Sequence, residues 1–138
     1  MFKRIVLLFI VGCFVFSGST ALAVDMQEGK WEITMEMKGM PVAMPPMKHV
    51  QCLTRENLVP QEPNANQECT FIKNELVGNT VSWIMECDSG EGPVESSGEI
   101  TYKGDRFDGV IETTMNDGGR GEMQMTNVLT GRRIGPCD

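Results

Sequence analysis

The stretch Gly29–Lys38, GKWEITMEMK, decides the fold class of this chain. Large apolar side chains recur at every second position, at Trp31, Ile33, Met35 and Met37. The positions between them are polar: Glu32, Thr34, Glu36 and Lys38. Because successive side chains of a β-strand point to opposite faces, this alternation predicts a half-buried strand, and it assigns Met35 and Met37 to the core side with Trp31.

The same period of two returns along the rest of the chain, in residues 48–53, 69–77, 80–87, 96–115 and 122–134. Gly78-Asn79 and Gly104-Asp105 interrupt it, and both dipeptides suit two-residue hairpin turns. No segment of ten or more residues after residue 23 has a helical period. We therefore expect an all-β fold: an antiparallel meander of about seven strands, curled into a barrel or a closed sandwich that protects its edges.

The first 23 residues have the three parts of a secretory signal peptide. Lys3 and Arg4 precede an apolar run of about a dozen residues, and the segment ends in ALA at residue 23. The run is too short to span a bilayer, which needs about 20 apolar residues. We expect a signal peptide at 1–23, a single β domain at 24–138 and no membrane span after cleavage.

A lipoprotein is the alternative interpretation of this N-terminus. The residues before Cys13 read IVGC and resemble a lipoprotein processing site. However, only about six apolar residues would precede that site, fewer than the 7 to 15 of an ordinary apolar region. This argues against lipid anchoring at Cys13 and favours a soluble exported product.

The expected mature chain is acidic and small. The full chain has a net charge of −7, and removal of Lys3 and Arg4 leaves −9. Such a surface repels phosphate backbones, so we expect no nucleic-acid partner. One domain of this size buries a modest core and gains from crosslinks.

Four cysteines remain after residue 23, at positions 52, 69, 87 and 137. An even number in a small exported domain indicates two disulfides, for which three pairings are possible. If the hairpin turn is centred on Gly78, opposite residues have numbers that add up to 156, which places Cys69 opposite Cys87. The register therefore predicts Cys69–Cys87 and leaves Cys52–Cys137 as the second bridge.

The segment 35–49, MEMKGMPVAMPPMKH, is the candidate site of this chain because it combines five methionines with the only histidine. Thioether and imidazole groups are ligands that suit Cu(I), so a copper site is one interpretation. Its candidate ligands are Met40, Met44, Met47 and His49, and Met123 with Met125 forms a second candidate pair. The alternative is that these methionines form an apolar flap beside the core.

Nothing else in the sequence indicates catalysis. His49 is the only possible imidazole base, and no serine lies in a nucleophile-elbow pattern. We therefore expect no enzyme, no catalytic residues and no cofactor unless copper is bound. Two interpretations of the interior are left: the domain encloses an apolar ligand, or its own side chains fill the interior and leave no room for one. Arg132 and Arg133 form a lone basic spot, which pairs with an acidic face or binds an anion.

Several motifs in order resemble one known family: GKWEITMEMKGMPVAMPP, QCLT, GNTVSWIMEC, SGEITYKGDRFDGVIETTM and TGRRIGPC. From about Gly29 to Cys137 the chain resembles the bacterial exported proteins of domain-of-unknown-function family 3617. The resemblance implies a Gram-negative envelope location and a small, mainly β domain with paired cysteines. It implies no activity and no site residues. Together these observations predict a periplasmic binding or interaction module for an apolar ligand or an envelope protein, with Cu(I) binding as the alternative.

Overall fold

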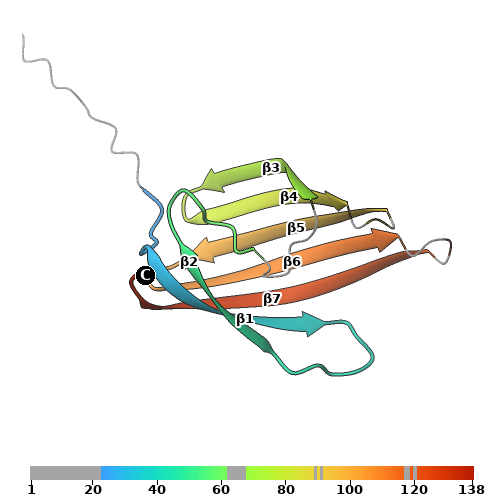
Figure 1. The fold of residues 1–138 in the computed structure, drawn as a ribbon, viewed down its shortest axis with the longest axis horizontal. Coiled ribbons are helices and arrows are strands. Elements are labelled where there is room, and N and C mark those ends of the chain that lie inside the picture. The colour runs from blue at the N-terminus through green and yellow to red at the C-terminus, as the bar shows by residue number, and fades with distance from the viewer. Residues whose placement is uncertain (1–22, 62–67, 89, 91, 117–118, 120) are drawn as a thin grey trace, which may run out of the picture.

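The computed structural model describes residues 23–61, 68–88, 90, 92–116, 119 and 121–138. The signal peptide expected at 1–23 and the lipidation alternative at Cys13 thus lie outside the described residues, apart from Ala23. Seven antiparallel strands and no helix occur in the described part (Figure 1). They are β1 Gly29–Lys38, β2 Met47–Leu53, β3 Glu68–Val77, β4 Thr80–Asp88, β5 Pro93–Tyr102, β6 Arg106–Asn116 and β7 Glu122–Gly135.

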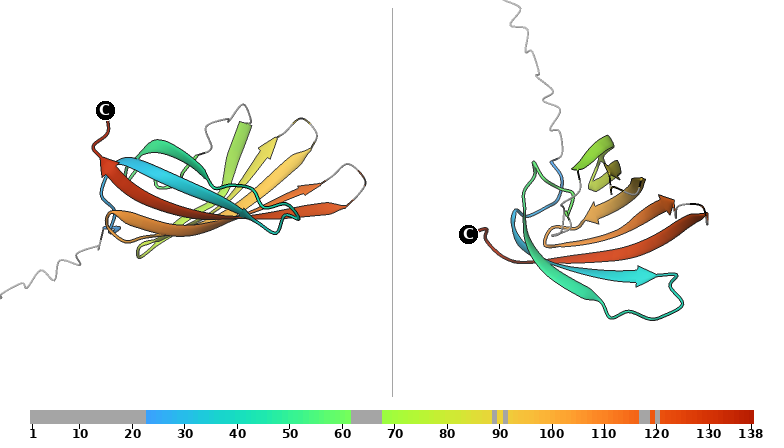
Figure 2. Two further views of the ribbon diagram at one scale, coloured as in Figure 1. Left: turned by 90° about the horizontal axis from the view of Figure 1, so that it is seen from below. Right: turned by 45° about the vertical axis from the view of Figure 1, so that its right-hand side comes forward.

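The strands form one sheet in the order β2-β1-β7-β6-β5-β4-β3, which confirms the predicted all-β antiparallel class. Strands β3 to β7 follow one another as a meander. Strand β1 pairs with β7, and β2 pairs with the other side of β1, so β2 is the edge strand at that end of the sheet. The sheet is twisted, and β2 and β3 form its two edges (Figure 2). The expected closure into a barrel or sandwich is therefore wrong, because the pairing of β1 with β7 leaves β2 and β3 at opposite edges.

The two faces of the sheet differ as the alternation predicted. One face, called here the core face, carries the buried side chains of Trp31, Ile33, Tyr102, Phe107 and Leu129. The opposite face, called the outer face, carries charged and polar side chains such as Glu32 and Arg132. Trp31 stacks on Phe107 and meets Tyr102 edge to face, with ring centroids 5.5 and 5.9 Å away. This aromatic cluster is the centre of the core.

Two segments outside the strands cover one end of the core face. Val24 and Met26 precede β1, Leu58 and Val59 follow β2, and all four belong to the buried cluster. The hydroxyl of Tyr102 donates a hydrogen bond to the Leu58 carbonyl oxygen. Since these segments replace a second sheet over this end, the domain buries its core without closing.

A β-bulge decides the pairing of Cys69 with Cys87. Beside the Gly78-Asn79 turn, paired residue numbers add up to 157, and beyond Ile72 they add up to 156. The predicted Cys69–Cys87 bridge is confirmed, although the constant register from which we predicted it is wrong near the turn. Ile72 is the extra residue of β3; if it were paired regularly instead of bulged, the register beside the turn would place Cys69 opposite Asp88.

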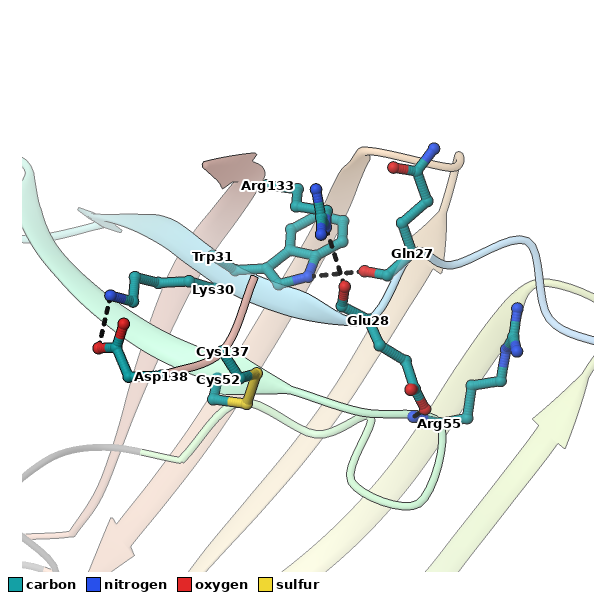
Figure 3. Close-up of a disulfide and its surroundings, with 9 residues drawn as sticks. All are labelled: Gln27, Glu28, Lys30, Trp31, Cys52, Arg55, Arg133, Cys137 and Asp138. Atoms are coloured by element: carbon teal, nitrogen blue, oxygen red, sulfur yellow. Dashed lines mark hydrogen bonds and ion pairs between the residues drawn. A yellow bond between two sulfur atoms is a disulfide. The ribbon is translucent and has the colours of Figure 1, made fainter. Parts of the chain in front are cut away.

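The second predicted bridge, Cys52–Cys137, is also present. It joins edge strand β2 to the residues after β7, and beside it the Lys30 ammonium lies 2.7 Å from the Asp138 carboxylate (Figure 3). The C-terminus is thus attached across β1. No helix in the described residues is long and apolar enough to cross a membrane.

Candidate functional site: a methionine-rich half of the core face

Methionines from five strands gather on the half of the core face that the two covering segments leave open. Directly paired residues share a face, so Met35 lies beside Met47 in β2 and Leu129 in β7. Met115 likewise lies beside Met123. We define the methionine face by the six of these methionines that are not fully buried: Met37, Met47, Met85, Met115, Met123 and Met125.

Burial falls along β1 and β7 toward the methionine face. In β7, Leu129 is completely buried, Met125 is half-buried and Met123 is 50% exposed. In β1, Trp31 is completely buried and Met37 is half-buried. The core face therefore changes from a packed core at one end to a partly exposed apolar surface at the other. Thioether side chains suit such a surface, because methionine is flexible and adapts to irregular shapes.

One buried polar group lies within this apolar surface. Asn127 is only 5% exposed, and its register places it between Met37 of β1 and Ile111 of β6. Its Oδ1 atom is buried and has no hydrogen-bond partner among the described residues. A buried amide oxygen without a donor is unfavourable in a folded protein, so this atom is unusual among the described residues.

The four predicted copper ligands lie in two different places in the structure. Met47 and His49 lie on the same face of β2, and His49 Nε2 is buried without a hydrogen-bond partner in the described part of the chain. Met40 and Met44 lie in the exposed segment between β1 and β2, at 44% and 48% exposure. The described residues contain no group of three or more His, Cys, Asp or Glu side chains that could hold a metal ion.

The second candidate pair, Met123 and Met125, does share one face of β7. We did not predict from the sequence that Met115 lies beside this pair, that Met85 lies on the same face of the sheet, or that Asn127 is buried there. The alternation in β7 indicated which of its side chains share a face. Only the pairing of β6 with β7 shows that Met115 lies opposite Met123.

The outer face carries several basic residues of this acidic protein. Lys103, Arg106 and Arg132 line a shallow hollow of about 390 Å³ together with Glu32 and Asp108. The Arg132 guanidinium lies 3.3 Å from Glu32, and Lys103 lies 2.6 Å from Asp108. Of the two interpretations of the Arg132-Arg133 spot, pairing with acidic side chains is thus confirmed for Arg132.

A second hollow of about 360 Å³ on this face is lined by Ser82, Ile84 and Ser97, among others.

Burial raises the pKa of Tyr102 well above that of an ordinary tyrosine. Its phenol is therefore a neutral hydrogen-bond donor to Leu58 and has a structural role at the covered end.

Comparison with known proteins identifies a family. A family model described as "Protein of unknown function (DUF3617)" matches residues 26–137. No curated protein and no solved structure matches the chain.

Proposed function

The chain belongs to the DUF3617 family, and we propose that it is a non-catalytic periplasmic protein that binds an apolar ligand on its methionine face. The observation that supports this proposal most is Asn127, a buried and unpartnered amide oxygen within a partly exposed apolar surface of the described structure. The preferred ligand is an uncharged apolar molecule with one hydrogen-bond donor. The apolar part would cover the methionines, and the donor would pair with Oδ1 of Asn127.

The acidic surface supports an uncharged ligand. The expected mature chain carries a net charge of −9, so it disfavours anionic amphiphiles. The bridges Cys52–Cys137 and Cys69–Cys87 are consistent with an oxidising compartment such as the periplasm.

A fluorescent probe tests the proposal. N-phenyl-1-naphthylamine is neutral and apolar and has one N–H donor, and its emission rises when it leaves water. We expect saturable binding to the exported protein. Met123→Lys should weaken it about tenfold or more, because a charge would enter the apolar contact. Met44→Lys is the matched control, since Met44 is 48% exposed and Met123 50%. Absence of saturable binding, or equal effects of the two changes, would refute the proposal.

The role of Asn127 has a separate test. Asn127→Leu removes the acceptor and keeps a side chain of similar size, so the protein should stay folded. We expect this variant to lose affinity for the amine probe and to keep its affinity for pyrene, which has no donor. An unchanged preference for the amine would show that Asn127 does not contact the ligand.

Cu(I) binding remains a second proposal because of one observation: His49 Nε2 is buried and unpartnered within the described residues, and Met47 lies on the same face of β2. Cu(I) accepts thioether and imidazole ligands. Met35, which lies opposite Met47, would be a third ligand in place of Met40 or Met44.

Competition with a Cu(I) chelator tests this second proposal. If the site is formed on the sheet, Met47→Leu should lower Cu(I) affinity, whereas Met40→Leu with Met44→Leu should not. If only the Met40→Leu and Met44→Leu variant loses Cu(I) affinity, the copper site lies in the segment between β1 and β2. If the wild-type protein does not hold Cu(I) at micromolar buffered concentrations, the copper proposal is refuted.

A further inference from the structure

Strand β3 is an exposed edge with apolar side chains. All ten of its residues are exposed, and it pairs only with β4 in the described structure. Four large apolar side chains are among them: Phe71, Ile72, Leu76 and Val77, at 41%, 59%, 45% and 68% exposure. A long edge of this kind presents unpaired backbone N–H and C=O groups, and it is a template for pairing with another strand.

The edge is also held in place. The disulfide Cys69–Cys87 fixes one end of β3 to β4, and the tight turn at Gly78 fixes the other. An ordered edge loses little conformational entropy when it pairs with another strand. The edge is thus prepared for association.

The charges of β3 are complementary to a second copy of the same strand. Lys73 and Glu75 lie on one side of β3, with Nζ 3.1 Å from the carboxylate. In an antiparallel pair centred on Asn74, Lys73 of each copy would lie opposite Glu75 of the other. The same register would place Leu76 opposite Ile72, the bulged residue of β3. One register therefore pairs the charges at the centre of the contact and brings the exposed Leu76 and Ile72 together.

The other edge does not have this complementarity. Strand β2 contains Lys48 and no acidic residue, and Lys48 already lies 3.8 Å from Glu32 of β1. An antiparallel pair of two β2 strands would gain no ion pair. The charge pattern thus selects β3.

We propose that the protein forms a symmetric dimer through antiparallel pairing of β3 with β3 of a second copy, in the register centred on Asn74. The two sheets would then form one sheet of 14 strands, from seven in each copy. Open sheets of this width are known in larger proteins. The contact lies at the β3 edge, so it is independent of the proposed ligand on the methionine face.

A charge exchange tests both the contact and its register. Lys73→Glu would create two Glu–Glu contacts in the dimer, and Glu75→Lys would create two Lys–Lys contacts. Either change should weaken dimerisation about tenfold or more, as measured by analytical ultracentrifugation of the exported protein. A mixture of the two variants restores both Lys–Glu pairs, so it should form a heterodimer. Labelling one variant with ¹⁵N allows native mass spectrometry to distinguish this heterodimer from homodimers.

Lys38→Glu is the matched control. Lys38 forms an ion pair with Glu36 at 2.8 Å, with side-chain exposure similar to that of Lys73, but it lies on β1 inside the sheet. This change should leave dimerisation intact.

Three results would overturn the inference. The first is a wild-type protein that stays monomeric at high micromolar concentration. The second is dimerisation that neither charge change affects, or that the mixture does not restore. The third is a series of larger oligomers, which would indicate pairing of β3 with β2 of the next copy.

Discussion

Glycines on the core face lie beneath large side chains of the neighbouring strand. A Cβ atom on Gly131 would lie 2.0 Å from Cε1 of Phe107, and one on Gly98 would lie 2.2 Å from Trp83. Neither glycine needs a positive φ, so steric space is the reason for glycine at these positions. The missing side chains let Phe107 and Trp83 lie against the sheet and complete the core.

We predict that Gly131→Ala destabilises the protein by about 1 to 3 kcal/mol, because the added methyl group would displace the buried Phe107 ring. Urea unfolding followed by tryptophan fluorescence measures this change. Gly135→Ala is the control, since the described structure leaves 4 Å of open space around the place its methyl group would take, and it should change stability little. Equal unfolding midpoints for the two variants would contradict the prediction.

Tyr102 gives a second prediction, because its pKa is raised by burial and it is the only tyrosine. A raised pKa in the folded state means that stability is complete below pH 10, the ordinary tyrosine pKa. Above that pH the unfolded chain ionises first, so the free energy of unfolding should fall by up to about 1.4 kcal/mol per pH unit. Tyr102→Phe should remove this fall.

Absorbance at 295 nm measures the ionisation of Tyr102 directly. In the native protein this signal should appear together with unfolding. An ordinary reversible titration near pH 10 in folded protein would show that the phenol is accessible.

Two disulfides crosslink the sheet, and one of them lies beside the covering segment that follows β2. Residues 54–61 follow β2, which the bridge Cys52–Cys137 joins to the C-terminus across 85 residues of sequence. The Cys69–Cys87 bridge spans only 18 residues, between adjacent strands. In the chain-entropy model a longer loop gives a larger stabilisation, here about 4.6 against about 3 kcal/mol.

We therefore predict that replacing Cys52 and Cys137 by serine destabilises the protein more than replacing Cys69 and Cys87. The expected difference in the free energy of unfolding is about 1.5 kcal/mol. Urea unfolding of the two double variants measures it, and peptide mapping without reduction confirms which bridge remains. A larger loss for the Cys69 and Cys87 variant would mean that edge strand β3 contributes more than loop length does.

The residues just after the predicted cleavage site are packed against the sheet. Val24 is buried, and the Asp25 amide donates a hydrogen bond to Asn79 Oδ1 at 2.8 Å. The Asp25 carbonyl accepts a hydrogen bond from Gly104 at 2.7 Å, so the segment is attached to both hairpin turns. We predict that N-terminal sequencing of the exported protein starts at Val24. A lipid-modified Cys13 at the N-terminus would contradict both the boundary and the soluble periplasmic location.

Local patterns in the sequence were sufficient to predict the strands and two of the turns that connect them. The alternation from Trp31 to Met37 depends on neighbouring residues only, and the same holds for the Gly104-Asp105 turn. For this reason the all-β class and the hairpins were predictable. The sharing of one face by Met123 and Met125 was predictable for the same reason.

The tertiary structure determined the strand order, the open edges and the methionine face. The pairing of β1 with β7 joins residues about a hundred positions apart, such as Glu32 and Arg132, and no local pattern records it. The extra residue Ile72 changes the register of β3 by one and brings Cys69 opposite Cys87. Period and turn chemistry are properties of a short segment. Pairing between distant strands depends instead on how all the apolar side chains pack together on one face, and this packing places Asn127 among the methionines.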